Sequence, residues 1–143
     1  MLENVFDPHN ISAVMRTCDA VGACLAVPRL PWVPEALARG NTLRRPACVH
    51  WAGRDVCQWL RDQRSAGSRV VGVELAEEAV RLGDLPAARR RTIAVLGHEQ
   101  TGIPADAVDL LDVAVEIPMV GSGASLNVAV AGSLVLYRLA GLI

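Results

Sequence analysis

Residues 114–137 read Ala-Val-Glu-Ile-Pro-Met-Val-Gly-Ser-Gly-Ala-Ser-Leu-Asn-Val-Ala-Val-Ala-Gly-Ser-Leu-Val-Leu-Tyr, and this stretch decides the fold. An apolar strand runs into a glycine-rich loop and then into a helix that is apolar almost all round. Glycine lets backbone groups approach a ligand closely, because it has no Cβ and tolerates positive φ. A helix that starts at Ser125 or Leu126 directs N–H groups and a partial positive charge towards that ligand. The pattern predicts a binding site with Ser125 and Asn127 at the junction.

Length and composition describe one domain over residues 1–143. Hydrophobic residues make up 52% of the chain and the mean hydropathy is +0.31, so much of the chain is expected to be buried. No apolar run reaches the roughly 18 residues of a membrane span. No basic-then-apolar signal segment opens the sequence, so we expect a cytoplasmic protein.

The charge balance leaves the partner open. A net charge of −1 argues against a general binder of polyanions. All 14 basic residues are arginine, which fits a GC-rich coding bias. Clusters at residues 44–45 and 89–91 are able to contact phosphates, because arginine binds them through a two-pronged guanidinium. Each cluster alone fits a solvated loop equally well.

The four cysteines, Cys18, Cys24, Cys48 and Cys57, have no CxxC spacing and no matching pair of histidines. Cys18 and Cys24 lie in or beside apolar segments and are expected to be small core residues. We expect neither a metal site nor a disulfide.

Strand-like and helical patterns alternate along the chain, which predicts an α/β fold with a mainly parallel sheet flanked by helices. The expected strands cover residues 2–6, 23–27, 69–75, 92–96 and 113–117. The expected helices run from an N-cap at Asn10 to Gly22, over 54–65, from Pro104 to about 111, and over 126–142. Residues 28–46 are expected to be mostly loop, with a short helix near 34–38.

Polar residues follow the ends of several predicted strands, where open α/β sheets bind their ligands. Asn10 and Arg16 follow the first strand, Glu74 ends the third, and residues 97–102 and 121–127 follow the last two. The layout predicts one composite site. Taken singly, Arg16 also fits a solvated surface residue, and Glu99, Ser125 and Asn127 also fit ordinary positions at helix starts. Neither a GxGxxG after the first strand nor a P-loop is present, which disfavours an ordinary nucleotide-binding domain.

Three blocks of the sequence resemble the three motifs of the SpoU/TrmH family of RNA ribose 2′-O-methyltransferases. Residues 4–22, Asn-Val-Phe-Asp-Pro-His-Asn-Ile-Ser-Ala-Val-Met-Arg-Thr-Cys-Asp-Ala-Val-Gly, resemble the first motif. Residues 96–103, Leu-Gly-His-Glu-Gln-Thr-Gly-Ile, resemble the second, and residues 117–131 the third. The order and spacing of the blocks also fit, and the resemblance covers essentially the whole chain.

The resemblance implies an α/β-knot (SPOUT) fold with a deep trefoil knot at the C-terminal end. It implies S-adenosylmethionine as the methyl donor and an obligate homodimer with its sites at the interface. By motif position, the residues implied in cofactor binding are Val73, Glu74, Leu75, Leu96, Gly97, Ile117, Met119, Ser125 and Leu126.

By motif position, the resemblance also implies that Arg16 is the central catalytic residue. Around it would lie Asn10, Glu99, Ser125 and Asn127. The implied reaction is attack of a ribose 2′-hydroxyl on a sulfonium methyl group. Because a guanidinium is a poor base at pH 7, we expect Arg16 to grip the RNA and stabilise the developing oxyanion.

A tRNA substrate is favoured because the first motif looks closest to the tRNA-modifying branch, and rRNA is the alternative. The chain begins almost inside its first strand, so we expect the family's N-terminal RNA-recognition extension to be absent. The arginine loops at 39–45 and 89–91 would then bind the RNA. A competing hypothesis is a catalytically weak module of the same fold that only binds cofactor or RNA.

Overall fold

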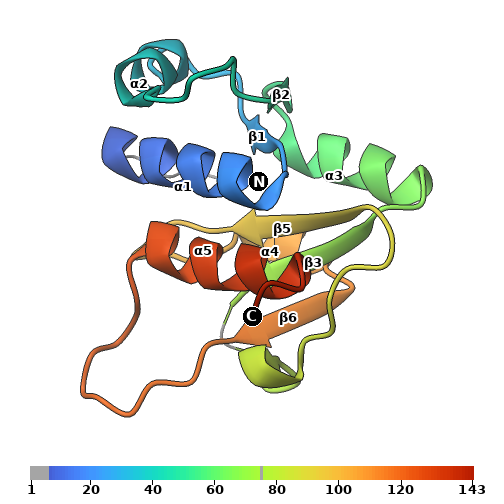
Figure 1. The fold of residues 1–143 in the computed structure, drawn as a ribbon. Coiled ribbons are helices and arrows are strands. Elements are labelled where there is room, and N and C mark those ends of the chain that lie inside the picture. Colours follow the sequence, from blue (N-terminus) through green and yellow to red (C-terminus); the bar gives the residue numbers. More distant parts are fainter. Residues whose placement is uncertain (1–6, 75) are drawn as a thin grey trace.

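The computed structural model describes residues 7–74 and 76–143 and shows a parallel sheet covered by helices (Figure 1). The helices are α1 (Pro8–Val21), α2 (Val33–Gly40), α3 (Val56–Ser65), α4 (Ala105–Val108) and α5 (Val128–Leu139), with a 3₁₀ turn at Leu82–Asp84. The strands are β1 (Leu25–Val27), β2 (Val49–Trp51), β3 (Arg69–Val73), β4 (Val80–Arg81), β5 (Thr92–Leu96) and β6 (Val113–Glu116).

The main sheet has the strand order β4-β6-β3-β5, and β1 pairs with β2 in a smaller sheet. Neighbouring strands in both sheets are parallel, as the sequence predicted. The strand expected at residues 2–6 lies outside the described residues. The sequence did not predict β2 and β4, because they are short and carry little of the buried apolar pattern that identifies a strand.

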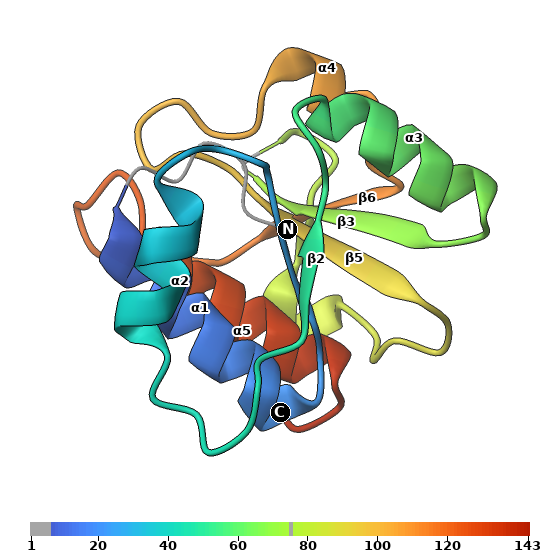
Figure 2. The same ribbon diagram turned by 90° about the horizontal axis from the view of Figure 1, so that it is seen from above.

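Alternate residues of the central strands face opposite layers of the molecule. Val70 and Ile93 pack in the cluster that contains Leu60 of α3 and residues of α4. Val71 and Ala94 pack on the other side, in the cluster that contains buried residues of α5. Figure 2 shows the sheet between these two groups of helices, with α1 beside α5 and α2 beside α1.

The N-cap of helix α1 is Asp7 and not Asn10. The Asp7 carboxylate accepts a hydrogen bond of 2.8 Å from the His9 backbone N–H, and Pro8 occupies the first turn, where its missing N–H costs nothing. That backbone bond, followed by the His9 side chain, lowers the pKa of the Asp7 carboxyl. The helix ends at Gly22 with φ of +72°, as predicted.

Helix α5 is shorter than expected. It begins at Val128, after Asn127 as N-cap, and six of its 12 residues are buried. Within the described residues, no helix is long and apolar enough to cross a membrane.

The turn before β5 is tied to the C-terminal end of α5. Arg138 donates from Nε to the Leu85 carbonyl at 2.6 Å and from Nη2 to the Gly83 carbonyl at 2.7 Å. The Ala88 N–H donates to the Leu139 carbonyl at 2.7 Å. Leu85 itself is fully buried between the sheet and α5.

The expectation for the cysteines was half wrong. Cys18 is buried in the core as predicted, and burial raises the pKa of its thiol. Cys24, however, is exposed and forms a disulfide with Cys48. The two residues directly precede the paired positions Leu25 and Val49. Sequence spacing did not reveal this pairing because β2 was not predicted.

We expect Leu85→Ala to lower the free energy of unfolding by about 2–5 kcal/mol, because it empties a fully buried position. Val120→Ala, at a fully exposed position, is the control and should change it by less than about 0.5 kcal/mol. Urea denaturation of the ligand-free protein measures both. Equal losses in the two variants would contradict the packing of Leu85 against α5.

Candidate active site

The loop after β5 holds a carboxylate at a fixed position. His98 and Gly102 exchange two backbone hydrogen bonds, of 2.9 and 2.8 Å, and so close a tight turn over residues 98–102. A Cβ on Gly97 would lie 2.3 Å from the Gly102 carbonyl carbon, and Gly102 itself has φ of +71°. Both positions therefore require glycine, and Glu99 is presented inside the turn.

Glu99 joins the three sequence motifs. Its Oε1 accepts hydrogen bonds from Asn10 Nδ2 at 3.1 Å and from Asn127 Nδ2 at 2.9 Å. Asn127 Nδ2 also donates to Asn10 Oδ1 at 2.9 Å, so the three side chains form a closed triangle. Asn10 is only 5% exposed. A buried amide in such a triangle is held in one orientation, because turning it would break its bonds.

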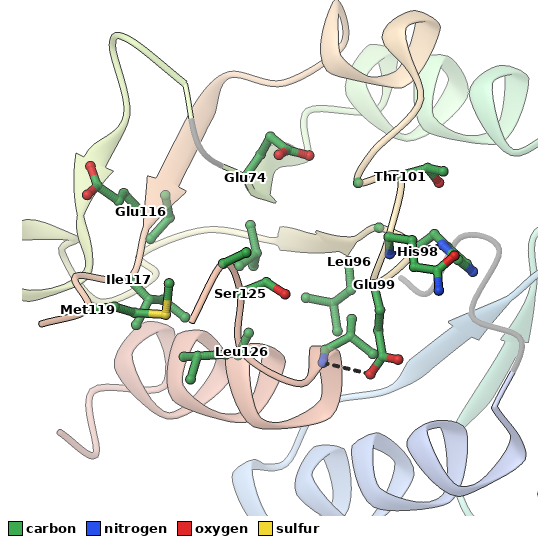
Figure 3. A pocket seen from close by; sticks show the side chains of 18 residues that line it. Glu74, Leu96, His98, Glu99, Thr101, Glu116, Ile117, Met119, Ser125 and Leu126 are labelled. Carbon is green, nitrogen blue, oxygen red and sulfur yellow. Dashed lines mark hydrogen bonds between the residues drawn. The ribbon is translucent and has the colours of Figure 1, made fainter. Parts of the chain in front are cut away.

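Side chains of the protein itself accept the hydrogen bonds of the first backbone N–H groups of α5. Asn127 Oδ1 accepts from the backbone N–H groups of Ala129 and Val130, at 2.9 and 3.2 Å. The Val128 N–H points to Glu99 Oε1 at 3.5 Å (Figure 3). The expectation that these amides face a ligand is therefore wrong. The helix dipole instead stabilises the negative charge of Glu99.

The glycine-rich loop is exposed and extends away from the sheet (Figure 1). Neither Gly121 nor Gly123 has a positive φ, and a Cβ on either would meet no atom within 4 Å. The packing of the protein therefore does not require glycine at these two positions. Any requirement must come from a molecule that binds against the loop.

A cavity of about 320 Å³ lies at the carboxyl ends of β3, β5 and β6 (Figure 3). Eight of the nine residues predicted to bind the cofactor line it, and Leu75 lies outside the described residues. The eight are Val73, Glu74, Leu96, Gly97, Ile117, Met119, Ser125 and Leu126.

Sequence reasoning missed some of the residues that line this cavity, among them Glu116, Val128 and Ala131. Val128 and Ala131 are one helical turn apart on α5, a spacing from which they could have been predicted. Glu116 ends β6, and its position would have followed from the rule that ligands bind beyond strand ends. The Glu74 carboxylate lies at the same edge, where its Oε2 accepts from the Ile103 N–H at 2.9 Å.

Arg16 lies on a different surface. It is exposed and lines a second, open cavity of about 610 Å³ between α1 and α5, together with Asn10, Asn127 and Tyr137. Arg16 follows Asn10 by six positions on α1, which corresponds to a rise of about 9 Å. Glu99 lines the first cavity, whereas both asparagines line the second, so the triangle of hydrogen bonds forms a wall between the two.

The two cavities offer different chemistry. The first combines apolar side chains with the carboxylates of Glu74, Glu99 and Glu116, and so suits a ligand with an apolar body, hydroxyl groups and a positive charge. The second offers a guanidinium beside amide groups, which suits a phosphate-bearing ligand.

Comparison with known proteins agrees with the three motifs. The sequence model of the SpoU rRNA Methylase family matches residues 1–137. The chain is 35% identical over 142 residues to the tRNA (guanosine(18)-2′-O)-methyltransferase of Escherichia coli, covering 96% of this chain and 60% of that protein. The chain thus spans less than two thirds of that relative.

Solved structures of the same kind share the fold. The Aquifex aeolicus TrmH/SpoU tRNA modifying enzyme superposes with a TM-score of 0.80 at 29% identity, covering 99% of this chain and 72% of that one. The AdoMet-bound rRNA methyltransferase of Sinorhizobium meliloti gives 0.80 at 28% identity, covering 96% and 53%. The chain belongs to the SpoU rRNA Methylase family.

Proposed function

We propose that this protein transfers a methyl group from S-adenosylmethionine to a ribose 2′-hydroxyl of RNA. One observation carries the proposal: the hydrogen bonds of Glu99 to Asn10 and Asn127 join all three motifs in the wall between the two cavities. A donor in the first cavity and an acceptor in the second would meet at this wall. The E. coli and S. meliloti relatives are methyltransferases of tRNA and rRNA, which supports the same reaction here.

The first cavity fits S-adenosylmethionine in size and chemistry. Leu96, Ile117 and Leu126 offer apolar walls for a purine ring, and the backbone around Gly97 offers polar groups. The carboxylates of Glu74 and Glu116 suit ribose hydroxyls or a positive charge. When bound, S-adenosylmethionine supplies an activated methyl group on a sulfonium.

The residues of the chain contribute alignment and charge stabilisation. Asn10 and Asn127, fixed by Glu99, orient the ribose of the RNA at the wall. The Arg16 guanidinium grips a phosphate and stabilises negative charge that develops on the 2′-oxygen. The hydroxyl proton leaves to phosphate or water. Ser125, on the rim of the first cavity, orients groups at the junction.

The groove between α1 and α5 supports a homodimer. Val130 is 50% exposed and Ile143 is 56% exposed, and both line the second cavity with Leu134 and Tyr137. An apolar groove of this kind marks a contact surface. In a two-fold dimer through its apolar part, at Val130, Leu134 and Ile143, the part with Asn10 and Asn127 would be left for the RNA, and Arg16 of one subunit would serve the wall of the other.

A trefoil knot is also proposed, with α5 as the threaded segment. Two features support it. The turn at residues 82–88 holds the C-terminal end of α5 through Arg138 and Leu139. The loop at 97–102 holds its N-terminal end through Glu99. Helix α5 therefore lies between two segments that flank β5.

We propose tRNA as the substrate, since the E. coli and A. aeolicus relatives modify tRNA, and rRNA is the alternative. We propose a cytoplasmic location, where the protein would meet either RNA. We treat residues 1–143 as one catalytic domain, with the arginine loops at 39–45 and 89–91 as its RNA contacts. One hydrogen-bond network joins Asn10, Glu99 and Asn127. This network disfavours the hypothesis of a catalytically weak module that only binds cofactor or RNA.

Isothermal titration calorimetry tests the cofactor site. We expect each chain to bind one S-adenosylmethionine, and Leu126→Ala to weaken binding roughly 5- to 30-fold through lost apolar contact. Val120→Ala is the control, because Val120 does not line the cavity. Loss of affinity in Val120→Ala alone, or in neither variant, would place the donor elsewhere.

Incubation of the protein with labelled S-adenosylmethionine and unmodified tRNA, followed by nucleoside analysis, tests the reaction. We expect 2′-O-methyl nucleosides from the wild type and about 100-fold slower formation by Arg16→Lys, because an ammonium cannot make the forked contact. Cofactor affinity should be unchanged in this variant. Cofactor binding without any 2′-O-methyl product from tRNA or rRNA would refute the proposal.

Asn127→Asp tests the wall with little change of shape. The variant retains a helix cap but brings a second carboxylate close to Glu99. Two such carboxylates raise the pKa of one of them, so a shared proton restores the hydrogen bond only at low pH. We expect its activity relative to wild type to be lowest at pH 8 and to rise as the pH falls towards 6. A ratio that is constant with pH would contradict the role of the Asn127 donor.

The same two variants test the shared site. Chains with Arg16→Lys and chains with Asn127→Asp are co-expressed, so that mixed dimers form. If each site takes Arg16 from one subunit and Asn127 from the other, one of the two sites in a mixed dimer has both natural residues. Random pairing then leaves roughly a quarter of the sites intact and restores activity accordingly. If Arg16 serves its own chain, mixing restores nothing.

A further inference from the structure

The Cys24–Cys48 disulfide joins two strands that are already paired. The Leu25 N–H donates to the Cys48 carbonyl at 2.8 Å, and the next residues of both strands continue the parallel ladder. The two Cα atoms lie 4.7 Å apart. The backbone brings the two sulfurs within bonding distance, but the ladder starts at this pair, so strand pairing does not restrain the residues before Cys48.

The surroundings of the pair favour thiol chemistry. Cys24, Cys48 and His50 are all exposed, and their ligand atoms lie within 4.8 Å of one another. His50 Nε2 is 3.8 Å from Cys48 Sγ, within reach of a hydrogen bond to sulfur. A hydrogen bond from His50 stabilises a Cys48 thiolate, so Cys48 is the better leaving group and Cys24 is the sulfur that an incoming thiol attacks.

The disulfide closes a segment that carries exposed arginines. Within it, α2 is anchored independently, since Val33 and Ala36 are buried against the core. Residues 41–48 contain neither helix nor strand and include Arg44 and Arg45. Leu43 and Ala47 hold this stretch by partial burial.

One arginine of this stretch lies beside α1, which lines the second cavity. Arg45 pairs with Asp19 of α1 at 3.6 Å, and Asp19 follows Arg16 by three residues, on the same side of the helix. Both members of the pair are partly exposed, and such pairs are weak. The disulfide therefore adds a covalent restraint close to Arg44 and Arg45, beside weaker non-covalent ones.

We propose that Cys24, Cys48 and His50 form a thiol–disulfide exchange site that holds or releases the arginine-bearing residues 41–48 and thereby adjusts affinity for RNA. The last step rests on the proposed function.

Two low-molecular-weight thiols reduce the bond: the first forms a mixed disulfide with Cys24 and releases the Cys48 thiolate, which takes up a proton. The second frees Cys24, and the products are two protein thiols and one small disulfide. A small disulfide reverses the sequence. Disulfides of cytoplasmic proteins are usually reversible in this way.

The exchange is tested on the full chain in glutathione buffers of varied redox ratio. Alkylation and mass spectrometry should show one disulfide per chain that forms and opens reversibly. Cys48→Ser should abolish it, whereas Cys57→Ser should not. His50→Gln should slow exchange about threefold to tenfold and leave the pairing intact.

Failure of the folded chain to form the bond would overturn the proposal. Tight binding of zinc by the reduced chain, lost in Cys48→Ser, would also overturn it and make the trio a metal site.

Hydrogen exchange and RNA binding test the consequence. On reduction, amides of residues 41–48 should exchange at least about tenfold faster, while those of α5 keep their rates. The dissociation constant for tRNA should rise about threefold to tenfold, and Cys48→Ser should resemble the reduced wild type in either buffer. Unchanged exchange at 41–48 would overturn the release step. Faster exchange without any tRNA binding in either state would instead overturn the proposed function and leave the exchange site supported.

Discussion

Glu99 Oε1 holds together parts of the chain that are far apart in sequence. It accepts hydrogen bonds from Asn10 at the start of α1 and from Asn127 at the start of α5, while its own position depends on the turn between Gly97 and Gly102. Asn10, which is only 5% exposed, needs such partners, because an unpaired buried amide would lose its hydration without compensation. The wall between the two cavities exists because this requirement is met by side chains from all three motifs.

The parallel sheet explains why the site lies where it does. Parallel strands end at the same edge, so the segments after β3, β5 and β6 meet there and enclose the first cavity. Helix α5 closes it, with Val128 and Ala131 facing the cavity and Val135 and Leu139 packed against the sheet. One helix thus contributes to the core and to the lining of the first cavity.

Much of the fold could be predicted from local patterns. The strands β3, β5 and β6 carry apolar runs between turn residues, and α1 and α3 carry helical spacing, so their existence was predicted with small errors at the ends. The short strand β2 carries no such signal, and with it the Cys24–Cys48 pairing was missed. The cap of α1 was misplaced because Asn10 has a capping side chain, but tertiary contacts bury it in the network with Glu99.

The sequence by itself determined the α/β class, the three motifs, the family resemblance and the residues that gather at the strand ends. Those features depend on residue type and spacing along the chain. Only the tertiary structure decided that Asn127 and Glu99 occupy the first amides of α5, that Arg16 faces a separate groove, and that two cysteines meet. These are distances between segments remote in sequence, and they depend on how strands pair and helices pack. Residues of the stretch 114–137 line the first cavity, whereas the first amides of its helix are bonded to side chains of the protein and do not face a ligand.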